Sequence, residues 1–199
     1  MNPFRKMQIK IFLLFTALFT SLAINAQQLY KCDDTQSFWA FSKDEPYQYV
    51  KLSGFAKETE RKSMISVGDY VLQNVIADKS KHMENGAAED LKILVRYALS
   101  EAEYLSGIFG KWIDIKMEKP LLSNGMEALL WWFELPMMPD NQVKSQLFVN
   151  VISGDKIFGL SSSQFEGQEF EDVKKFLIAV IGSLKRVTDA RDFEKLCSK

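Results

Sequence analysis

The stretch VNVISGDKIFGLSSS, residues 149–163, decides the fold class because it places a turn between two strand-like runs. Residues 144–152 (KSQLFVNVI) are a strand-like run, Gly154-Asp155 supplies turn-forming residues, and residues 156–164 (KIFGLSSSQ) form a second strand-like run. Two such runs separated by a short turn are typical of a β-hairpin. The sequence therefore predicts two adjacent antiparallel strands.

Two further strands are predicted on the N-terminal side of this hairpin. Residues 112–118 (WIDIKME) alternate, and Ser123-Asn124-Gly125 is a turn signal. Residues 126–135 (MEALLWWFEL) are almost all apolar, which indicates a central strand or one that is buried on both faces. Together with the hairpin, these runs predict a meander of about four strands.

Two helices are predicted, one before and one after the meander. The first covers residues 88–106, and Glu89 and Asp90 lie in its first turn, where acidic side chains favour the helix dipole. The second lies near residues 169–185 and carries a wide apolar stripe. The apolar positions at helical spacing are Leu91, Leu94, Val95, Ala98, Ala102 and Leu105 in the first helix, and Phe170, Val173, Phe176, Leu177, Val180, Ile181 and Leu184 in the second.

The N-terminal part of the chain also favours strands. Residues 38–42 (FWAFS) and 47–53 (YQYVKLS) are aromatic runs on either side of Lys43-Asp44-Glu45-Pro46, which predicts a hairpin. Residues 64–77 fit a helix or a strand, and we favour a strand because of Gly68 and the β-branched content. The charged residues 57–62 are expected to face solvent, and residues 78–86 to form a loop.

The order of these elements predicts an α+β sandwich. We expect an antiparallel sheet of about five to seven strands with the two main helices packed on one face. The segment from about 112 to 186 resembles the C-terminal half of the PsbP-like fold, a group that includes photosystem extrinsic proteins and DcrB-type bacterial envelope proteins. The resemblance rests on VNVISGDKIFGLSSS followed by FLIAVIGSLKRV, residues 176–187. It implies a non-enzymatic accessory or binding module and transfers no functional residues.

The first 26 residues are typical of a secretory signal peptide. The basic residues Arg5, Lys6 and Lys10 precede an uncharged apolar run, Ile11 to Ile24, that is shorter than the roughly 20 residues of a membrane-spanning helix. We expect cleavage after Ala26, with Ser21-Leu22-Ala23 as the alternative site; a retained N-terminal anchor is the other interpretation. Residues 27–199 are then a single periplasmic or secreted domain with no membrane span.

Charge and cysteine content limit the partners and the chemistry. Removing three positive charges and no negative ones changes the formal net charge from −1 to −4, and no basic block stands out. We therefore expect no nucleic-acid partner. Cys32 and Cys197 are expected to form a disulfide in an oxidising compartment, with free thiols or intermolecular pairing as the alternatives. Two distant cysteines and one histidine do not make a zinc site.

No residue pattern predicts catalysis, a metal site or a cofactor. His82, the only histidine, lies in a Lys-rich segment that is expected to be exposed, and no G-x-S-x-G sequence is present. The acidic stretch EGQEFED, residues 166–172, lacks the spacing of a calcium loop and is better explained as a helix start. Glu101 and Glu103 do not share a helix face. We expect the protein not to be an enzyme, although an envelope hydrolase that uses carboxylates and a structural subunit are alternatives.

Tryptophan residues provide the candidate ligand surface. Trp131 and Trp132 are adjacent on one predicted strand and must point to opposite faces of the sheet. In one interpretation, one of them lies on the open sheet face near Trp39 or Phe41, where an exposed aromatic patch would bind a protein or a small ligand. In the other, which we favour, a loop or the N-terminal hairpin covers that face. Neither interpretation identifies the partner.

Overall fold

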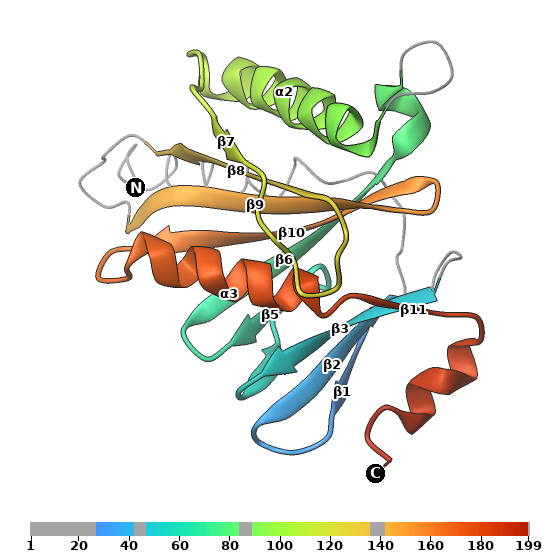
Figure 1. Ribbon diagram of the computed structural model, residues 1–199. Coiled ribbons are helices and arrows are strands. Elements are labelled where there is room, and N and C mark those ends of the chain that lie inside the picture. Colours follow the sequence, from blue (N-terminus) through green and yellow to red (C-terminus); the bar gives the residue numbers. More distant parts are fainter. Residues whose placement is uncertain (1–26, 42–46, 84–88, 136–141, 199) are drawn as a thin grey trace.

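The computed structural model of the chain describes residues 27–41, 47–83, 89–135 and 142–198 (Figure 1). The predicted signal peptide, residues 1–26, and the predicted turn at 43–46 lie outside the described residues. The described residues contain two helices and two antiparallel sheets, which confirms the predicted α+β class. Among the described residues, no helix is both long enough and apolar enough to cross a bilayer.

The larger sheet has seven strands in the order β4-β5-β6-β10-β9-β8-β7, and the smaller sheet has four in the order β1-β2-β3-β11. The strands of the larger sheet are β4 (Ala56–Glu58), β5 (Met64–Val67), β6 (Tyr70–Asp78), β7 (Lys116–Glu118), β8 (Ala128–Glu134), β9 (Val143–Ser153) and β10 (Lys156–Phe165). The smaller sheet contains β1 (Gln27–Lys31), β2 (Gln36–Phe41), β3 (Tyr47–Ser53) and β11 (Lys185–Val187). The helices are α2 (Asp90–Phe109) and α3 (Phe170–Gly182), with 3-10 turns η1 (Lys79–His82) and η2 (Ala190–Lys195).

The predicted hairpin lies in the middle of the larger sheet. β9 and β10 pair from Lys156 opposite Ser153 to Phe165 opposite Val143, and Gly154 takes the left-handed conformation that the tight turn requires, with φ of 67°. β8 pairs with the other edge of β9, and nearly all of its residues are buried. The sequence-based expectation of a buried strand in this position is therefore confirmed.

The ambiguous segment 64–77 is a β-hairpin. β5 and β6 pair across Gly68-Asp69, where Gly68 has φ of 55°. The strand interpretation is thus confirmed, and the glycine that argued against a helix is the turn residue. β1, β4 and β11 lie outside the strands that the sequence predicts. β4 and β11 have only three residues each, too few for a periodic pattern.

The two helices cover opposite faces of the larger sheet, which corrects the expectation that they share one face (Figure 1). Alternate residues of the central strands point to opposite faces, so Leu130 and Trp131 belong to different cores. The first core lies between the larger sheet, α3 and the smaller sheet; the second lies between the larger sheet and α2. First-core members include Leu52, Leu130, Val149 and Leu177, and second-core members include Leu94, Tyr97, Trp131 and Phe148.

The two ends of the described chain meet beside the smaller sheet. Cys32, directly after β1, forms a disulfide with Cys197, which is 165 residues further along the chain, and their Cα atoms lie 5.0 Å apart. β11 and η2 follow α3 and bring the C-terminal segment to this position (Figure 1). The structure therefore contains the disulfide that the sequence predicts.

Candidate functional site

The tryptophans expected at an open sheet face are largely buried. Trp39 and Trp131 are each 1% exposed. Trp131 stacks on Phe148 with ring centroids 4.0 Å apart, and its Nε1 donates a hydrogen bond of 2.8 Å to Oδ1 of Asn150. Both indoles are thus internal packing residues. The interpretation with an exposed aromatic surface around them is wrong, and the favoured one, in which the N-terminal hairpin covers the sheet face, is confirmed. Helix α2 covers one face of the larger sheet, and α3 with the smaller sheet, which contains the β2–β3 hairpin, covers the other.

Trp132 is half-buried beside α3. Its ring lies 5.3 Å from that of Phe170, and it packs against the first core, which also contains Trp39. Trp131 points to the opposite face, as adjacent strand residues must. The structure therefore brings Trp39 and Trp132 to the same core, separates both from Trp131, and makes no common surface from the three.

The exposed indole belongs to Trp112, whose side chain is 73% exposed. Helix α2 ends at Gly110, which has φ of 65°. The Ser106 hydroxyl then fixes the following turn, because it accepts a 2.8 Å hydrogen bond from the backbone N–H of Ile113 and donates one of 2.7 Å to the Ala102 carbonyl. Ile113 is pulled into the second core, with 6% exposure, so its neighbour Trp112 faces outward.

A hollow of about 200 Å³ lies beside Trp112, between the end of α2 and the β7–β8 edge of the larger sheet. Its apolar lining comes from both elements and from the chain between them, and charged groups form the remainder of the wall. The lining residues are Phe109, Lys111, Trp112, Ile113, Asp114, Lys116, Phe133, Glu134 and Leu135. We call this feature, including the Trp112 side chain, the Trp112 pocket.

Ion pairs occupy the sheet edge next to the Trp112 pocket. Lys116 Nζ lies 2.7 Å from Oε1 of Glu134, and this hydrogen bond, aided by the carboxylate charge, raises the pKa of Lys116. Further along the edge, Glu118 of β7 binds Lys174 of α3 at 2.8 Å, and Lys119 pairs with Glu127. A short edge strand with charged side chains resists pairing with a foreign strand. The charged side chains of β7 therefore protect this edge from strand addition.

His82 is half-buried against helix α2 and does not line the Trp112 pocket. It ends the 3-10 turn η1, and its ring packs edge-on against Tyr97 with centroids 5.2 Å apart. Burial, and then the charge of Lys81, lower the pKa of His82. Among the residues that the structure describes, no group of three or more His, Cys, Asp and Glu side chains could hold a metal ion.

Glu101 is the carboxyl group with the most unusual environment. It lies on α2 one turn after the buried Tyr97, and burial raises its pKa from 4.5 to about 7. In turn, burial and the Glu101 charge raise the pKa of Tyr97. Neither side chain lines the Trp112 pocket. The shift of Glu101 therefore bears on stability and not on the candidate site.

Replacing Glu101 with glutamine is expected to stabilise the protein near pH 8 and to change its stability little near pH 4. The folded protein holds the Glu101 proton more tightly than the unfolded chain, so this contribution to stability is complete below pH 4.5 and is lost as the pH rises through about 7. The full loss corresponds to about 3 kcal/mol. Urea unfolding at the two pH values measures it.

The matched control is Glu103→Gln, because Glu103 is an exposed acid on the same helix. Its effect should be small at both pH values. An equal effect of Glu101→Gln near pH 4 and near pH 8 would contradict the assignment of the shift to burial of the Glu101 carboxyl group.

Comparison with known proteins supports the fold. No protein-family model and no curated protein sequence matches the chain. Among solved structures, the chain is similar to cyanobacterial PsbP (CyanoP) from Synechocystis sp. PCC 6803, with a TM-score of 0.50 and 9% sequence identity. The match covers 78% of this chain and 94% of the PsbP chain, so it extends well beyond the residues 112–186 on which the resemblance was recognised. The chain therefore has a PsbP-like α+β fold.

Proposed function

We propose that the chain is an exported, non-catalytic binding or accessory module that holds a protein partner through the Trp112 pocket. The observation that carries the proposal is the 73% exposure of Trp112 beside a hollow whose wall combines apolar and charged side chains. Tryptophan is enriched among the residues that dominate interface energies. The Ser106 hydrogen bonds hold this indole outward, so its exposure follows from the local fold.

The size and charge of the Trp112 pocket indicate what kind of partner segment it would bind. A volume of about 200 Å³ is below the roughly 300–1,000 Å³ of sites for drug-sized ligands, but it suits one apolar side chain. Lys111 and Asp114 place one positive and one negative group at its wall. We therefore infer a protein segment that inserts an aliphatic or aromatic side chain and has charged residues on both sides of it.

Export is supported by two features. The N-terminal pattern of three basic residues, an apolar run and Ala26 is that of a signal peptide. The Cys32–Cys197 disulfide is of the kind that persists outside the reducing cytoplasm. Together they favour a periplasmic or secreted protein, and the PsbP-like fold is compatible with an accessory role.

The pocket composition favours binding over hydrolysis. A carboxylate hydrolase needs two acids on either side of a substrate, one with a raised pKa. Glu101, whose pKa is raised, does not line the pocket, and the Glu134 carboxylate is already paired with Lys116. His82 is also absent from the lining.

Capture from an envelope extract tests the proposed function. The Trp112→Ala substitution in the mature protein is expected to lower the affinity for the captured partner by at least about 30-fold. This corresponds to the loss of an interface residue that contributes about 2 kcal/mol. Leu99→Ala is the matched control, because Leu99 is a 50% exposed apolar residue on α2 that does not line the pocket.

The outcome that supports the proposal is a partner lost with Trp112→Ala and kept with Leu99→Ala. Circular dichroism of both variants should match the parent protein, because neither removed side chain is buried. Identical capture by all three proteins would rule out the Trp112 pocket as the binding surface.

A further inference from the structure

The C-terminal segment, residues 188–198, lies over the outer face of the smaller sheet. Trp39 and Val50 of this sheet point inward to the first core. Residues one position away in the strands point outward, and these include Tyr30, Phe38 and Tyr49. The rings of Phe38 and Tyr49 lie 5.5 Å apart. The outer face of the smaller sheet therefore has an aromatic surface of its own.

Phe193 of η2 packs on this aromatic surface. Its ring lies 6.1 Å from that of Tyr30 and 6.3 Å from that of Tyr49, and the side chain is only 2% exposed. Of the side chains in the C-terminal segment that the structure describes, Phe193 alone is buried. Noncovalent attachment of the segment to the sheet thus depends mainly on one aromatic side chain.

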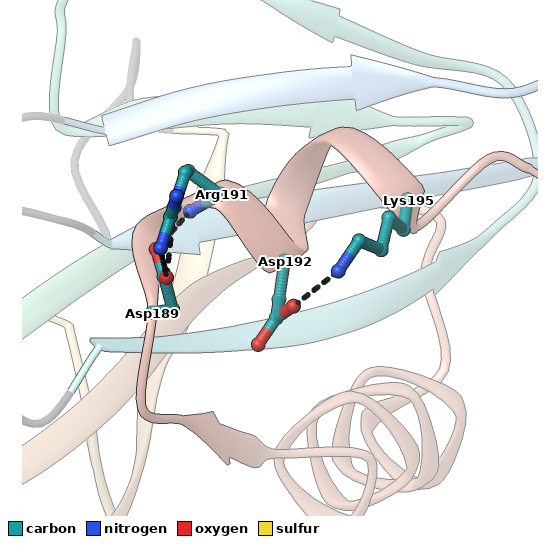
Figure 2. A network of polar contacts seen from close by, with 4 residues as sticks. All are labelled: Asp189, Arg191, Asp192 and Lys195. Carbon is teal, nitrogen blue, oxygen red and sulfur yellow. Dashed lines mark hydrogen bonds and ion pairs between the residues drawn. The ribbon is translucent and has the colours of Figure 1, made fainter.

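The ion pairs of the segment hold it to itself and not to the sheet (Figure 2). The Arg191 guanidinium donates a 2.8 Å hydrogen bond to Asp189, whose other oxygen accepts from the Arg191 backbone N–H at the start of η2. Lys195 binds Asp192 at 2.9 Å. All four residues belong to the segment itself. These contacts give η2 its shape but do not anchor it to the rest of the domain.

The disulfide is the remaining anchor, and it can be reached from solvent. Cys197 is exposed and Cys32 is half-buried. Exposed disulfides are the ones that act as labile or regulatory bonds. Without the bond, burial of Phe193 must offset the conformational entropy of ordering the whole segment, and one buried side chain is too little for that.

We propose that residues 188–198 are a redox-released cover for the aromatic surface formed by Tyr30, Phe38 and Tyr49. A dithiol reductant opens it: one thiolate attacks the sulfur of Cys197, an exposed residue, the S–S bond breaks, and Cys32 leaves as a thiolate. The second thiol of the reductant then displaces Cys197, so the reductant becomes a disulfide and both cysteines become thiols after protonation. Phe193 leaves the sheet, which uncovers the aromatic surface. This inference is independent of the Trp112 pocket.

Limited proteolysis with trypsin, with and without dithiothreitol, tests the cover. Reduction is expected to raise the cleavage rates after Arg191 and Lys195 at least tenfold. Cleavage after Lys62, an exposed residue before β5, should keep its rate and serves as the internal control for an intact domain. All digests are quenched, fully reduced and analysed by mass spectrometry, so that fragments held by the disulfide are counted.

Two variants sharpen the test. The double variant Cys32→Ser/Cys197→Ser should be cleaved after Arg191 at the fast rate with or without the reductant. Phe193→Ala should be cleaved faster than the parent protein while the disulfide is intact, because the tethered segment has lost its buried contact. Equal rates after Arg191 in oxidised and reduced protein would overturn the proposal. A matching rise after Lys62 would also overturn it, since reduction would then loosen the whole domain.

Discussion

Replacing Cys32 and Cys197 together with serine is expected to lower the free energy of unfolding by about 3–5 kcal/mol. The disulfide joins residues 165 positions apart, so it restricts nearly the whole unfolded chain. The chain-entropy relation gives roughly 5 kcal/mol for such a loop, and measured values are often lower. Urea unfolding, followed by circular dichroism, measures the difference from the oxidised parent protein.

The denaturant slope provides a second readout. Without the cross-link the unfolded chain expands, so the m-value should rise as stability falls. Parent protein in dithiothreitol is the control and should match the serine variant in both midpoint and slope. A loss below about 1 kcal/mol with an unchanged slope would contradict a role for the disulfide in restricting the unfolded chain.

Local sequence patterns were sufficient to predict most elements of the fold. The runs at 144–152 and 156–164 flank the turn at Gly154-Asp155, and the helix at 88–106 repeats its apolar residues at helical spacing. Such patterns report which face of each element is buried. The disulfide was also predictable, since it depends on the number of cysteines and on the compartment.

The placement of the helices and of the candidate site depends on tertiary contacts. The apolar run 126–135 already indicated burial on both faces, and two buried faces require a layer on each side of the sheet. The same reasoning predicts that the two helices lie on opposite faces of the larger sheet. The exposure of Trp112 does have a signal in the alternation of 112–118, because Trp112 falls on the polar side with Asp114 and Lys116, opposite the buried Ile113. The predicted surface at Trp39, Trp131 and Trp132 did not use that signal.

Replacing Gly159 with alanine is expected to destabilise the protein by about 3–4 kcal/mol. Gly159 lies on β10 directly opposite Asn150 of β9. A Cβ atom at this position would lie 2.1 Å from Nδ2 of Asn150, far inside van der Waals contact. Asn150 is 1% exposed, so its side chain has no free space to enter. Position 159 therefore requires glycine, because a larger side chain would collide with Asn150.

The loss of stability in Gly159→Ala has a second cause, because Asn150 also accepts the hydrogen bond of the Trp131 indole. Oδ1 of Asn150 accepts the hydrogen bond from Trp131 Nε1, and Trp131 is also buried. Displacing the amide leaves that N–H without its partner, which costs about 1–3 kcal/mol in a protein interior. The steric strain of an added methyl group in a packed core contributes a similar amount. Gly159, Asn150 and Trp131 therefore form one packing unit across three strands.

A double-mutant cycle separates the two parts. Asn150→Ala alone should cost about 1–3 kcal/mol because it removes the acceptor of the Trp131 indole. Adding Gly159→Ala to Asn150→Ala should cost little more, because the atom that the new methyl group would strike is gone. The cycle should then give a coupling energy of about 3 kcal/mol, close to the full cost of Gly159→Ala alone.

Gly107→Ala is the matched control for the glycine substitution itself. Gly107 is an exposed residue of α2 with nothing within 4 Å of an added Cβ, so alanine there should stabilise the helix by about 0.5–1 kcal/mol. Opposite signs for the two glycine-to-alanine changes would separate the steric effect at Gly159 from the general effect of replacing glycine. Strict additivity of Gly159→Ala and Asn150→Ala would instead show that the Asn150 side chain is not what excludes a methyl group at position 159, and the packing unit around Trp131 would have to be redrawn.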